Sequence, residues 1–404
     1  MSDTPWYADG RFRFGVGIED TFIPQERLGH RKLDEYELTQ HYTRWREDLD
    51  LVAESGAEFL RWGIPWYLVE PEPGRFDWSW IDQVAERMGE LGLRCIVDLM
   101  HYGTPLWLEN SFLNAAYPER VAAYGRAVAE RYRDVFTDFT PLNEPAVNAE
   151  WCGQNGAWPP YLTGQDGFVK VLLPIARGMV RTQQEIAAVH PGAVFVHVDA
   201  GFRYEGETSP VARDVLEERR FLALDLITGR IDDDSPIRLY LREHGVSESD
   251  LQWFRDNAVR PDVLGVNYYP HFTTVTMRDG VTSPVDAGAA GLRDLVTLYS
   301  RRYGLPIVVT ETSLVGTPEE KSAWLEESTR ELGALRDGGH DIVGYTWFPF
   351  FTMVDWLYRY GDREPDHWFL RFGLVDLVRG ADLSLERVRN STFDDFRRLA
   401  TEGR

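Results

Sequence analysis

Eight apolar, strand-like segments alternate with helix-like segments along the chain, and this alternation restricts the possible folds more than any other feature. The strand-like segments are residues 12–18, 58–64, 94–100, 136–142, 193–200, 262–268, 306–312 and 341–348. Several are apolar throughout, as strands are when both faces of a parallel sheet are buried. Helical spacing appears between the strands, for example at Trp45, Leu49, Val52 and Ala53.

The further predicted helices occupy residues 79–91, 118–134, 166–189, 211–228, 292–303, 318–336 and 383–400, with a long loop before 292–303. Ser79 is expected to cap the helix at 79–91 and Gly92 to end it. Eight strand–helix units in 404 residues predict an α/β fold, a single (β/α)₈ TIM barrel that spans residues 1–404 as one domain. A doubly wound sheet with a second domain is the alternative, but no Gly-rich phosphate loop follows the first strand.

Composition argues against several classes of partner. The formal net charge is −22 and the sequence pI is about 4.9, so nucleic acid and anionic membranes are expected to be repelled. No apolar stretch reaches the roughly 18 residues of a membrane span, and residues 1–6 do not have the pattern of a secretory signal. Cys95 and Cys152 are the only cysteines. These features predict a cytoplasmic protein with no disulfide framework, structural metal or cofactor.

Polar and aromatic residues gather where the predicted strands end. In a (β/α)₈ barrel the carboxyl ends of all strands meet at one face, and the chemistry of such barrels takes place there. The residues at or just after these ends are Arg61, His101, Asn143, Glu144, Asn267, Tyr268, Tyr269, Glu311 and Trp347. One assumption about the fold therefore brings residues from six strands into one pocket.

Two of these residues are candidate catalytic groups. Glu144 and Glu311 each end an apolar strand, and two carboxyl groups that face each other across a pocket can cleave a glycosidic bond. A general acid has to keep its proton near neutral pH, as burial or a neighbouring carboxylate would allow for Glu144. A nucleophile has to stay ionised, and Arg61 and Tyr269 are the best candidates to keep Glu311 so.

Each of these residues also has a purely structural interpretation. Glu144 with Asn143 can form a solvated turn and a helix cap, Arg61 can belong to a salt bridge at the barrel rim, and Tyr269 can be a half-buried aromatic. His101 can bind a sugar hydroxyl or pack as a structural residue, and no second histidine lies four residues further on to suggest zinc.

The chain contains 14 tryptophans, and most of them are expected in the core. Apolar faces of sugars pack well on aromatic rings, so a few tryptophans are expected to contact substrate. Trp347 is the best candidate because it ends the eighth strand, and Trp356, Trp107 and Trp158 lie in loops above the predicted pocket.

The chain resembles the family 1 glycoside hydrolases, which are retaining β-glycosidases of the large (β/α)₈ clan. The resemblance covers nearly the whole chain in the family's order. It rests on Arg61-Trp62-Gly63-Ile64-Pro65-Trp66, Met100-His101-Tyr102-Gly103-Thr104-Pro105, Asn143-Glu144-Pro145, Gly265-Val266-Asn267-Tyr268-Tyr269, Thr310-Glu311-Thr312 and Arg371-Phe372-Gly373-Leu374-Val375.

The resemblance implies a role for each matched residue. Glu144 would be the acid/base and Glu311 the nucleophile, held by Arg61 and Tyr269. The residues implied to bind the sugar are His101, Asn143, Asn267 and Trp347, the last as the floor of the subsite. In such enzymes the peptide that follows this tryptophan is often cis, which makes Trp347–Phe348 a candidate non-proline cis bond.

This sequence departs from the family at positions that read the outer hydroxyls of the sugar. Glu19 and Asp20 stand in the region where the family has a glutamine, and Asp355-Trp356 stands where it has Glu-Trp. Tyr102 replaces the usual tryptophan, and Thr312-Ser313 replaces Asn-Gly. Glu19, Asp355 and Trp356 are therefore expected to bind substrate, but β-glucoside or β-galactoside specificity does not follow.

The sequence thus predicts a β-glucosidase-like retaining enzyme whose partner is a small glycoside or an oligosaccharide. Two alternatives stay open: a sugar-binding or transglycosylating relative, and a lyase or isomerase with Mg²⁺ at Asp98, Glu144 and Asp199. The long loops at residues 153–167 and 273–290 are candidate lids. No oligomeric state is predicted.

Overall fold

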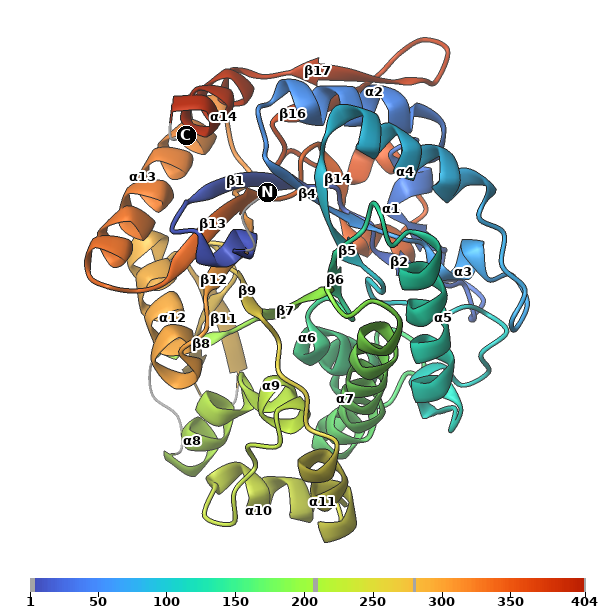
Figure 1. Ribbon diagram of the computed structural model, residues 1–404, viewed down its shortest axis with the longest axis vertical. Helices are drawn as coiled ribbons and strands as arrows, with labels where there is room; N and C mark the ends of the chain where they lie inside the picture. Colours follow the sequence, from blue (N-terminus) through green and yellow to red (C-terminus); the bar gives the residue numbers. More distant parts are fainter. Residues whose placement is uncertain (1–3, 206–209, 279–280, 403–404) are drawn as a thin grey trace.

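The computed structural model describes residues 4–205, 210–278 and 281–402, and a closed parallel barrel lies at its centre (Figure 1). All eight predicted strands are present, and each is hydrogen-bonded to its neighbours in chain order. They are β1 (Arg13–Gly17), β4 (Phe59–Gly63), β5 (Arg94–Asp98), β6 (Asp138–Thr140), β7 (Val194–Ala200), β9 (Val263–Asn267), β12 (Ile307–Thr312) and β13 (Ile342–Trp347). The predicted (β/α)₈ fold is confirmed.

Helices surround the barrel and bury its outer face (Figure 1). The main ones are α2 (His41–Glu54), α4 (Ser79–Leu91), α5 (Tyr117–Arg131), α7 (Gly164–Val189), α12 (Gly288–Tyr303), α13 (Pro318–Asp337) and α14 (Ser391–Glu402). Helix α4 shows why such segments are helical, because its buried residues Ile81, Val84, Ala85 and Met88 share one face. Gly92 ends it in the left-handed conformation, as expected. Ser79 is its first residue rather than its cap, since Asp77 accepts a hydrogen bond from the Ser79 backbone N–H at 3.0 Å.

Two of the predicted helices are wrong in part. Residues 211–228 form two helices, α8 (Pro210–Arg219) and α9 (Leu222–Ile227). In the C-terminal segment 383–400, Leu385–Arg389 is strand β17, paired with β16 (Val375–Arg379), and the helix begins only at Ser391. Tertiary contacts explain the strand, because the buried Arg387 side chain pairs with Asp48 of α2 at 2.7 Å.

Short helices and strands connect the main elements of the barrel. The predicted long loop contains the hairpin of β10 (Thr274–Arg278) and β11 (Val281–Val285), which pairs with β8 (Arg203–Glu205); residues 279 and 280 lie outside the described part. The remaining elements are η1 (Trp6–Ala8), β2 (Phe22–Ile23), β3 (Leu33–Asp34), α1 (Glu35–Leu38), α3 (Trp66–Val69), η2 (Ser111–Leu113), α6 (Pro145–Ala149), η3 (Glu150–Gln154), α10 (Pro236–Glu243), α11 (Glu248–Asp256), β14 (Met353–Val354), η4 (Trp356–Tyr360), η5 (Pro365–Trp368) and β15 (Phe369–Leu370).

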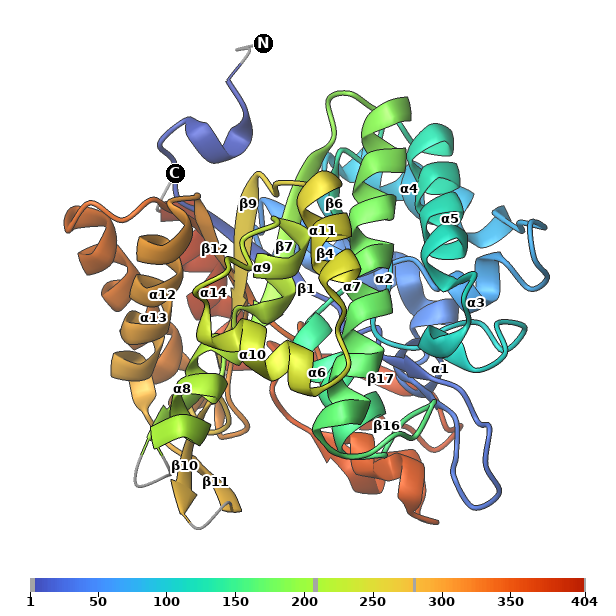
Figure 2. The same ribbon diagram turned by 90° about the horizontal axis from the view of Figure 1, so that it is seen from below.

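The amino-terminal segment closes one end of the barrel. Figure 2 shows η1 at the end of the molecule opposite to β10 and β11. Trp6 of η1 packs with small apolar strand residues and with Phe59, and its indole N–H donates to Asp138 at 2.6 Å. The opposite end, where the strands finish, is left for the loops that carry the predicted site.

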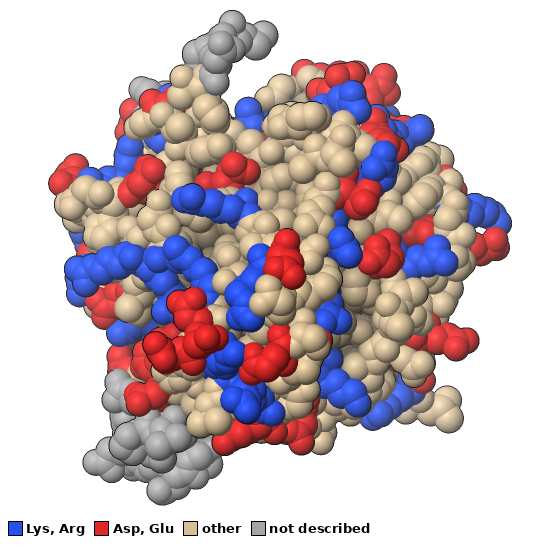
Figure 3. Space-filling view, turned by 60° about the horizontal axis from the view of Figure 1, so that its bottom comes forward, with Lys and Arg blue, Asp and Glu red and all other residues tan. Residues whose placement is uncertain are grey.

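Nucleic-acid binding and membrane insertion each require particular features of the surface or the helices. On the face in Figure 3, acidic and basic side chains are interspersed, and no continuous basic surface forms there. In the part of the chain that the structure describes, no helix is both long and apolar enough to cross a lipid bilayer.

Close packing inside the barrel yields a stability test at Gly15 of β1. A Cβ atom at this position would lie 2.2 Å from a ring carbon of Phe59, which is only 1% exposed. The buried ring has little room to move, so Gly15→Ala is expected to lower the free energy of unfolding by about 1–3 kcal/mol, measured by urea denaturation. The control is Gly89→Ala in α4, where nothing lies within 4 Å of the added atom and stability should not fall. Equal midpoints for the two variants would contradict this packing.

Candidate active site

A pocket of about 400 Å³ opens at the carboxyl end of the barrel, and both predicted catalytic glutamates line it. Glu311 is the fifth residue of β12, and Glu144 follows β6. Glu311 and Glu144 are 4% and 6% exposed, so both carboxyl groups are largely shielded from bulk water. Of the other predicted residues, His101, Tyr269, Glu19, Asp355 and Trp356 also line this pocket.

The backbone around Glu144 is held in an uncommon conformation. Glu144 has φ 47° and ψ 64°, in the left-handed region, and it directly precedes the short helix α6. Pro145 disfavours right-handed helical geometry at the residue before it, which agrees with this turn. Backbone N–H groups of Asn143 and Glu144 donate to Met100 of the neighbouring loop and to Val198 of β7, at 3.0 and 3.1 Å. These bonds fix the glutamate at the pocket wall.

Glu144 is surrounded by neutral hydrogen-bond donors. Oε1 accepts from the Asn267 side-chain amide at 2.7 Å, and Oε2 accepts from the Tyr102 hydroxyl. Within the described residues, no lysine or arginine forms an ion pair with it. Burial and the negative charge of Glu311 raise the pKa of Glu144 to about 8, while the two hydrogen bonds act in the opposite direction. Glu144 therefore carries a proton at neutral pH.

Glu311 has the opposite environment, with a cation in direct contact. Oε1 accepts from the Arg61 guanidinium at 2.7 Å, and Oε2 accepts from the Tyr269 hydroxyl at 2.8 Å. Both partners are those expected from the sequence. Burial raises the pKa of Glu311, but the positive charge and hydrogen bond of Arg61 oppose this rise. The pair of glutamates thus contains one carboxyl group with a cation and one without.

Arg61 joins Glu311 to a buried polar network. Its side chain is fully buried on β4, and its second terminal nitrogen donates to Asp98 at 2.5 Å and to Asn143 at 3.0 Å. The Asn143 amide nitrogen lies 2.9 Å from His101 Nε2 and donates to the Tyr102 hydroxyl at 3.1 Å. The expectation that Asn143 grips the sugar has no support here, because Asn143 is fully buried, does not line the pocket and is satisfied by protein partners.

Asn267 likewise lies behind the pocket wall rather than in it. It is 1% exposed, donates to Glu144 and accepts from the Thr310 hydroxyl at 2.7 Å. The site residues predicted to touch substrate thus divide into two groups. One group, which includes His101, lines the pocket. The other group is formed by Arg61, Asn143 and Asn267, which lie behind the pocket wall and hold the lining side chains Glu311, His101 and Glu144.

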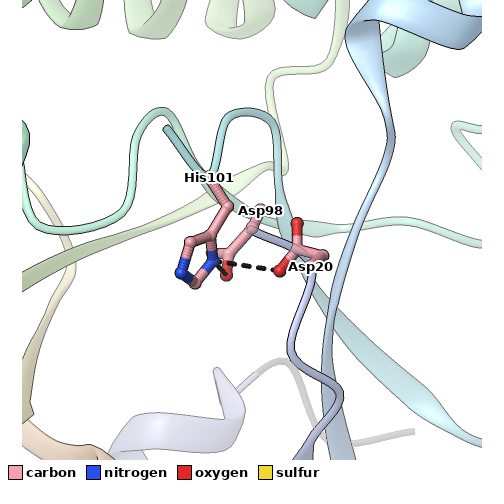
Figure 4. A group of neighbouring side chains, drawn as sticks. All are labelled: Asp20, Asp98 and His101. Atoms are coloured by element: carbon pink, nitrogen blue, oxygen red, sulfur yellow. Dashed lines mark ion pairs between the residues drawn. The ribbon is translucent and has the colours of Figure 1, made fainter. Parts of the chain in front are cut away.

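His101 is oriented by a carboxylate that sequence reasoning did not connect with it. Figure 4 shows its ring next to Asp20 and Asp98, with Nδ1 at 2.9 Å from Asp20 and 3.7 Å from Asp98. Burial lowers the pKa of His101, but the charges of Asp20 and Glu19 outweigh it and raise this pKa well above its usual value. Burial raises the pKa of Asp20 to about 7.

The three residues of Figure 4 could also hold a metal ion by distance, since their ligand atoms lie within 4.8 Å of one another. These groups already have protein partners, however, because Arg61 pairs with Asp98 and His101 contacts Asp20. A cation would have to displace the guanidinium from a fully buried position.

The predicted Mg²⁺ alternative is not supported either. Asp98 is bound to Arg61, and Asp199 lies next to His197 at 3.6 Å. Among the described residues, the set close enough to share a metal is that of Asp20, Asp98 and His101. Glu144 does not belong to it.

The predictions for Trp347 need correction. Trp347 is fully buried, does not line the pocket and donates its indole N–H to the Phe372 carbonyl at 3.1 Å. The cis peptide predicted at Trp347–Phe348 is wrong, because the cis bonds in this region are Phe348–Pro349 and His101–Tyr102. The ring of Phe348 stacks parallel to that of His101 instead.

The other loop tryptophans also separate into two groups. Trp356 lines the pocket together with Trp151, which the sequence did not place. Trp158 is fully buried and packs against the ring of Tyr102, and Trp107 donates to the Glu70 carbonyl at 2.6 Å. The spacing of Trp151, seven residues after Glu144 along a helical segment, could have indicated that both face the same cavity.

Comparisons with known proteins find relatives that are named as glycosidases. The model of a family described as β-galactosidase, glycoside hydrolase family 42, matches residues 36–136. The chain is 26% identical to the bifunctional β-D-glucosidase/β-D-fucosidase of Bifidobacterium breve, over 89% of this chain and 87% of that protein. It is 22% identical to the aryl-phospho-β-D-glucosidase of Bacillus subtilis, over 90% and 86%.

A solved structure extends the likeness to the fold. The family 1 β-glucosidase of Thermotoga maritima superimposes with a TM-score of 0.81 and 18% sequence identity, over 100% of this chain and 99% of that one. At this identity the superposition establishes the shared barrel, while the residues of the pocket have to be assigned from their own contacts.

Proposed function

We propose that this chain, a divergent glycoside hydrolase of the (β/α)₈ barrel clan, cleaves a β-glycoside by double displacement, with Glu311 as nucleophile and Glu144 as acid/base. One observation carries the assignment: Glu311 contacts a guanidinium, whereas Glu144, which lines the same pocket, contacts only neutral donors. Environments that push two carboxyl pKa values apart define an acid and a base.

The first step requires an ionised Glu311 and a protonated Glu144. The charge and hydrogen bond of Arg61 favour the ionised form of Glu311, and Tyr269 holds its second oxygen, so one carboxylate oxygen would attack the anomeric carbon. Glu144 transfers its proton to the glycosidic oxygen as the bond from carbon to that oxygen breaks. The products of this step are the free alcohol, a Glu144 carboxylate and a glycosyl ester of Glu311.

The second step reverses the role of Glu144. Esterification removes the negative charge of Glu311, which is the second-largest cause of the raised pKa of Glu144. The pKa of Glu144 therefore falls once the ester forms, and its carboxylate becomes a better-stabilised base. It takes a proton from water while the water oxygen attacks the anomeric carbon, which releases the sugar and restores both glutamates. Retaining chemistry of this kind uses carboxyl groups about 5–5.5 Å apart.

The sugar would occupy the part of the pocket next to Glu19, His101 and Asp355. Glu19 is 4% exposed, and its Oε1 accepts from the Thr21 backbone N–H at 3.0 Å. Its Oε2 is then available to a sugar hydroxyl. Asp355 uses Oδ1 to accept from the Leu357 backbone N–H at 2.8 Å. Both side chains would accept hydrogen bonds from hydroxyl groups of the sugar.

We infer two further properties of the protein. The barrel and its helices would act as a single catalytic domain over residues 1–404. The chain would work in a reducing compartment such as the cytoplasm, because Cys95 and Cys152 are buried and unpaired.

Removal of the nucleophile is the most direct test of its role. Glu311→Ala is expected to lower hydrolysis of an aryl β-glycoside by about a thousandfold or more, because the covalent step is lost. Azide should restore turnover and give the α-glycosyl azide, since it attacks from the face left empty. Glu326→Ala, at an exposed position of α13, is the control and should hydrolyse normally. Near-normal activity of Glu311→Ala would exclude the assignment.

The role of Glu144 as the acid is tested by how the rate of hydrolysis depends on the leaving group. Glu144→Gln keeps the shape but has no proton to give, so hydrolysis of alkyl glycosides should slow by about a hundredfold or more. A 2,4-dinitrophenyl glycoside, whose leaving group needs no proton, should form the glycosyl-enzyme at nearly the normal rate in single turnover. An equal loss for both substrates would show that Glu144 is not the acid.

The pH dependence tests the contact between Tyr102 and Glu144. The first step needs protonated Glu144, so kcat/KM should fall as the pH rises through an apparent pKa of about 8. The Tyr102 hydroxyl stabilises the carboxylate and lowers this pKa; Tyr102→Phe should therefore raise it and move the alkaline limb up by about one pH unit.

The matched control for this test is Tyr117→Phe. Tyr117 is equally buried, and its hydroxyl contacts Met100 rather than a carboxylate, so the alkaline limb should stay in place. An unchanged or lower limb in Tyr102→Phe would mean that the hydrogen bond does not influence the proton of Glu144.

A further inference from the structure

We propose that the leaving group of the natural substrate is apolar, an aryl or alkyl aglycone rather than a second sugar. This inference rests on the proposed function, because it needs Glu144 to mark the side on which the leaving group departs. It goes beyond that function by naming the chemical class of the group that the enzyme releases.

The exposure of the lining residues orders the pocket from its base to its rim. The two glutamates and His101 are each less than a tenth exposed and form the base. Leu357 and Phe272, which line the same pocket, are 52% and 48% exposed and stand at the rim. The charged and polar groups thus lie at the base of the pocket. Large apolar side chains lie at its rim, next to solvent, where the leaving group would be bound.

The wall of the pocket is apolar on the side of the proton donor. Val147 of α6 and Trp151 of η3 follow Glu144 by three and seven residues, and both line the pocket. Trp356 packs edge-on against Trp151 with ring centroids 5.4 Å apart. Trp158 supports both indoles from behind, at 4.8 and 5.0 Å. A leaving group that receives the proton of Glu144 would rest on this rigid aromatic wall.

The side of the nucleophile is apolar as well. Phe372 lies 5.9 Å from the ring of Tyr269, and Phe272 lies 6.5 Å from Phe372, so the aromatic surface continues from the nucleophile's partner to the rim. Phe202, from the loop after β7, completes this wall. An occupant between the two walls would contact aromatic rings on both sides.

The pocket has few groups to bind the hydroxyls of a second sugar. In the described ranges, no lysine, arginine, asparagine, glutamine or serine lines it. The hydroxyl of Thr273 accepts from the Tyr269 backbone N–H at 2.8 Å, and one oxygen of Asp355 is used by Leu357. A sugar bound here would bury hydroxyl groups without partners, whereas an apolar group would only displace water from rings and methyl groups.

The test compares leaving groups of nearly equal chemical reactivity. The sugar is first chosen as the best of a panel of 4-nitrophenyl β-glycosides. Its n-octyl and methyl β-glycosides and its β-1,4-linked disaccharide are then hydrolysed by the full-length protein. Both alcohols are poor leaving groups, so any preference between octyl and methyl reports apolar contact. We expect kcat/KM for the octyl glycoside to exceed that for the methyl glycoside by about tenfold or more and to exceed that for the disaccharide.

Substitution at the rim connects this preference to the structure. Leu357→Asp, at a half-exposed position that should not disturb folding, is expected to lower the octyl-to-methyl ratio to about threefold or less. The control Leu239→Asp changes a leucine of α10 that is 62% exposed and does not line the pocket, and it should leave the ratio unchanged.

The outcomes separate this inference from the function on which it rests. Hydrolysis of the nitrophenyl glycosides with an octyl-to-methyl ratio below about threefold, or with the disaccharide preferred, would overturn the apolar leaving group and leave the glycosidase intact. A ratio that Leu357→Asp does not lower would also overturn it. Failure to hydrolyse any nitrophenyl glycoside would reject the proposed function itself, and the inference with it.

Discussion

The buried guanidinium of Arg61 is the group on which the rest of the site depends. It is fully removed from solvent and donates to Glu311, Asp98 and Asn143 at 2.7, 2.5 and 3.0 Å. Loss of one partner from a buried ion pair costs about 3–5 kcal/mol, because the remaining charge is left uncompensated. Arg61 therefore does more than hold the nucleophile. It allows several carboxyl groups to be buried at the end of the barrel at all.

The same cation creates the difference between the two glutamates. Glu311 lies within its reach, while Glu144 faces Tyr102 and Asn267, which are neutral. Each glutamate has a tyrosine on one oxygen, so the asymmetry comes from the second partner: a guanidinium for Glu311 and an amide for Glu144. The negative charge of Glu311 then raises the pKa of Glu144, and its loss in the covalent intermediate reverses that effect. One ion pair can thus set the protonation states for both steps.

Sequence patterns predicted the barrel and the positions of both glutamates, because these depend on periodicity and on where strands end. They also indicated the contact of Arg61 and Tyr269 with Glu311. The failures have a common cause in tertiary packing. Trp347 ends its strand as predicted, yet its indole is covered and bound to the Phe372 carbonyl. Asn143 has the side chain expected of a sugar ligand, but protein groups already satisfy it.

The contacts that the sequence did not reveal join residues that are distant along the chain. Asp20 orients His101 from the loop after β1, and Tyr102 donates to Glu144 from the loop after β5. Tyr102 and Asp20 had been noted only as departures from the family pattern. Their contacts suggest that the departures are linked, since both residues act on the network that ends at the two glutamates.

The central claim is that Glu311 forms a covalent bond to the sugar. A 2-deoxy-2-fluoro β-glycoside with a good leaving group slows both steps but leaves the ester long-lived, so the labelled residue can be found by peptide mass spectrometry. The account predicts one sugar per chain, attached at residue 311. Attachment at a different carboxylate, or turnover of the normal substrate with inversion and without any adduct, would contradict it.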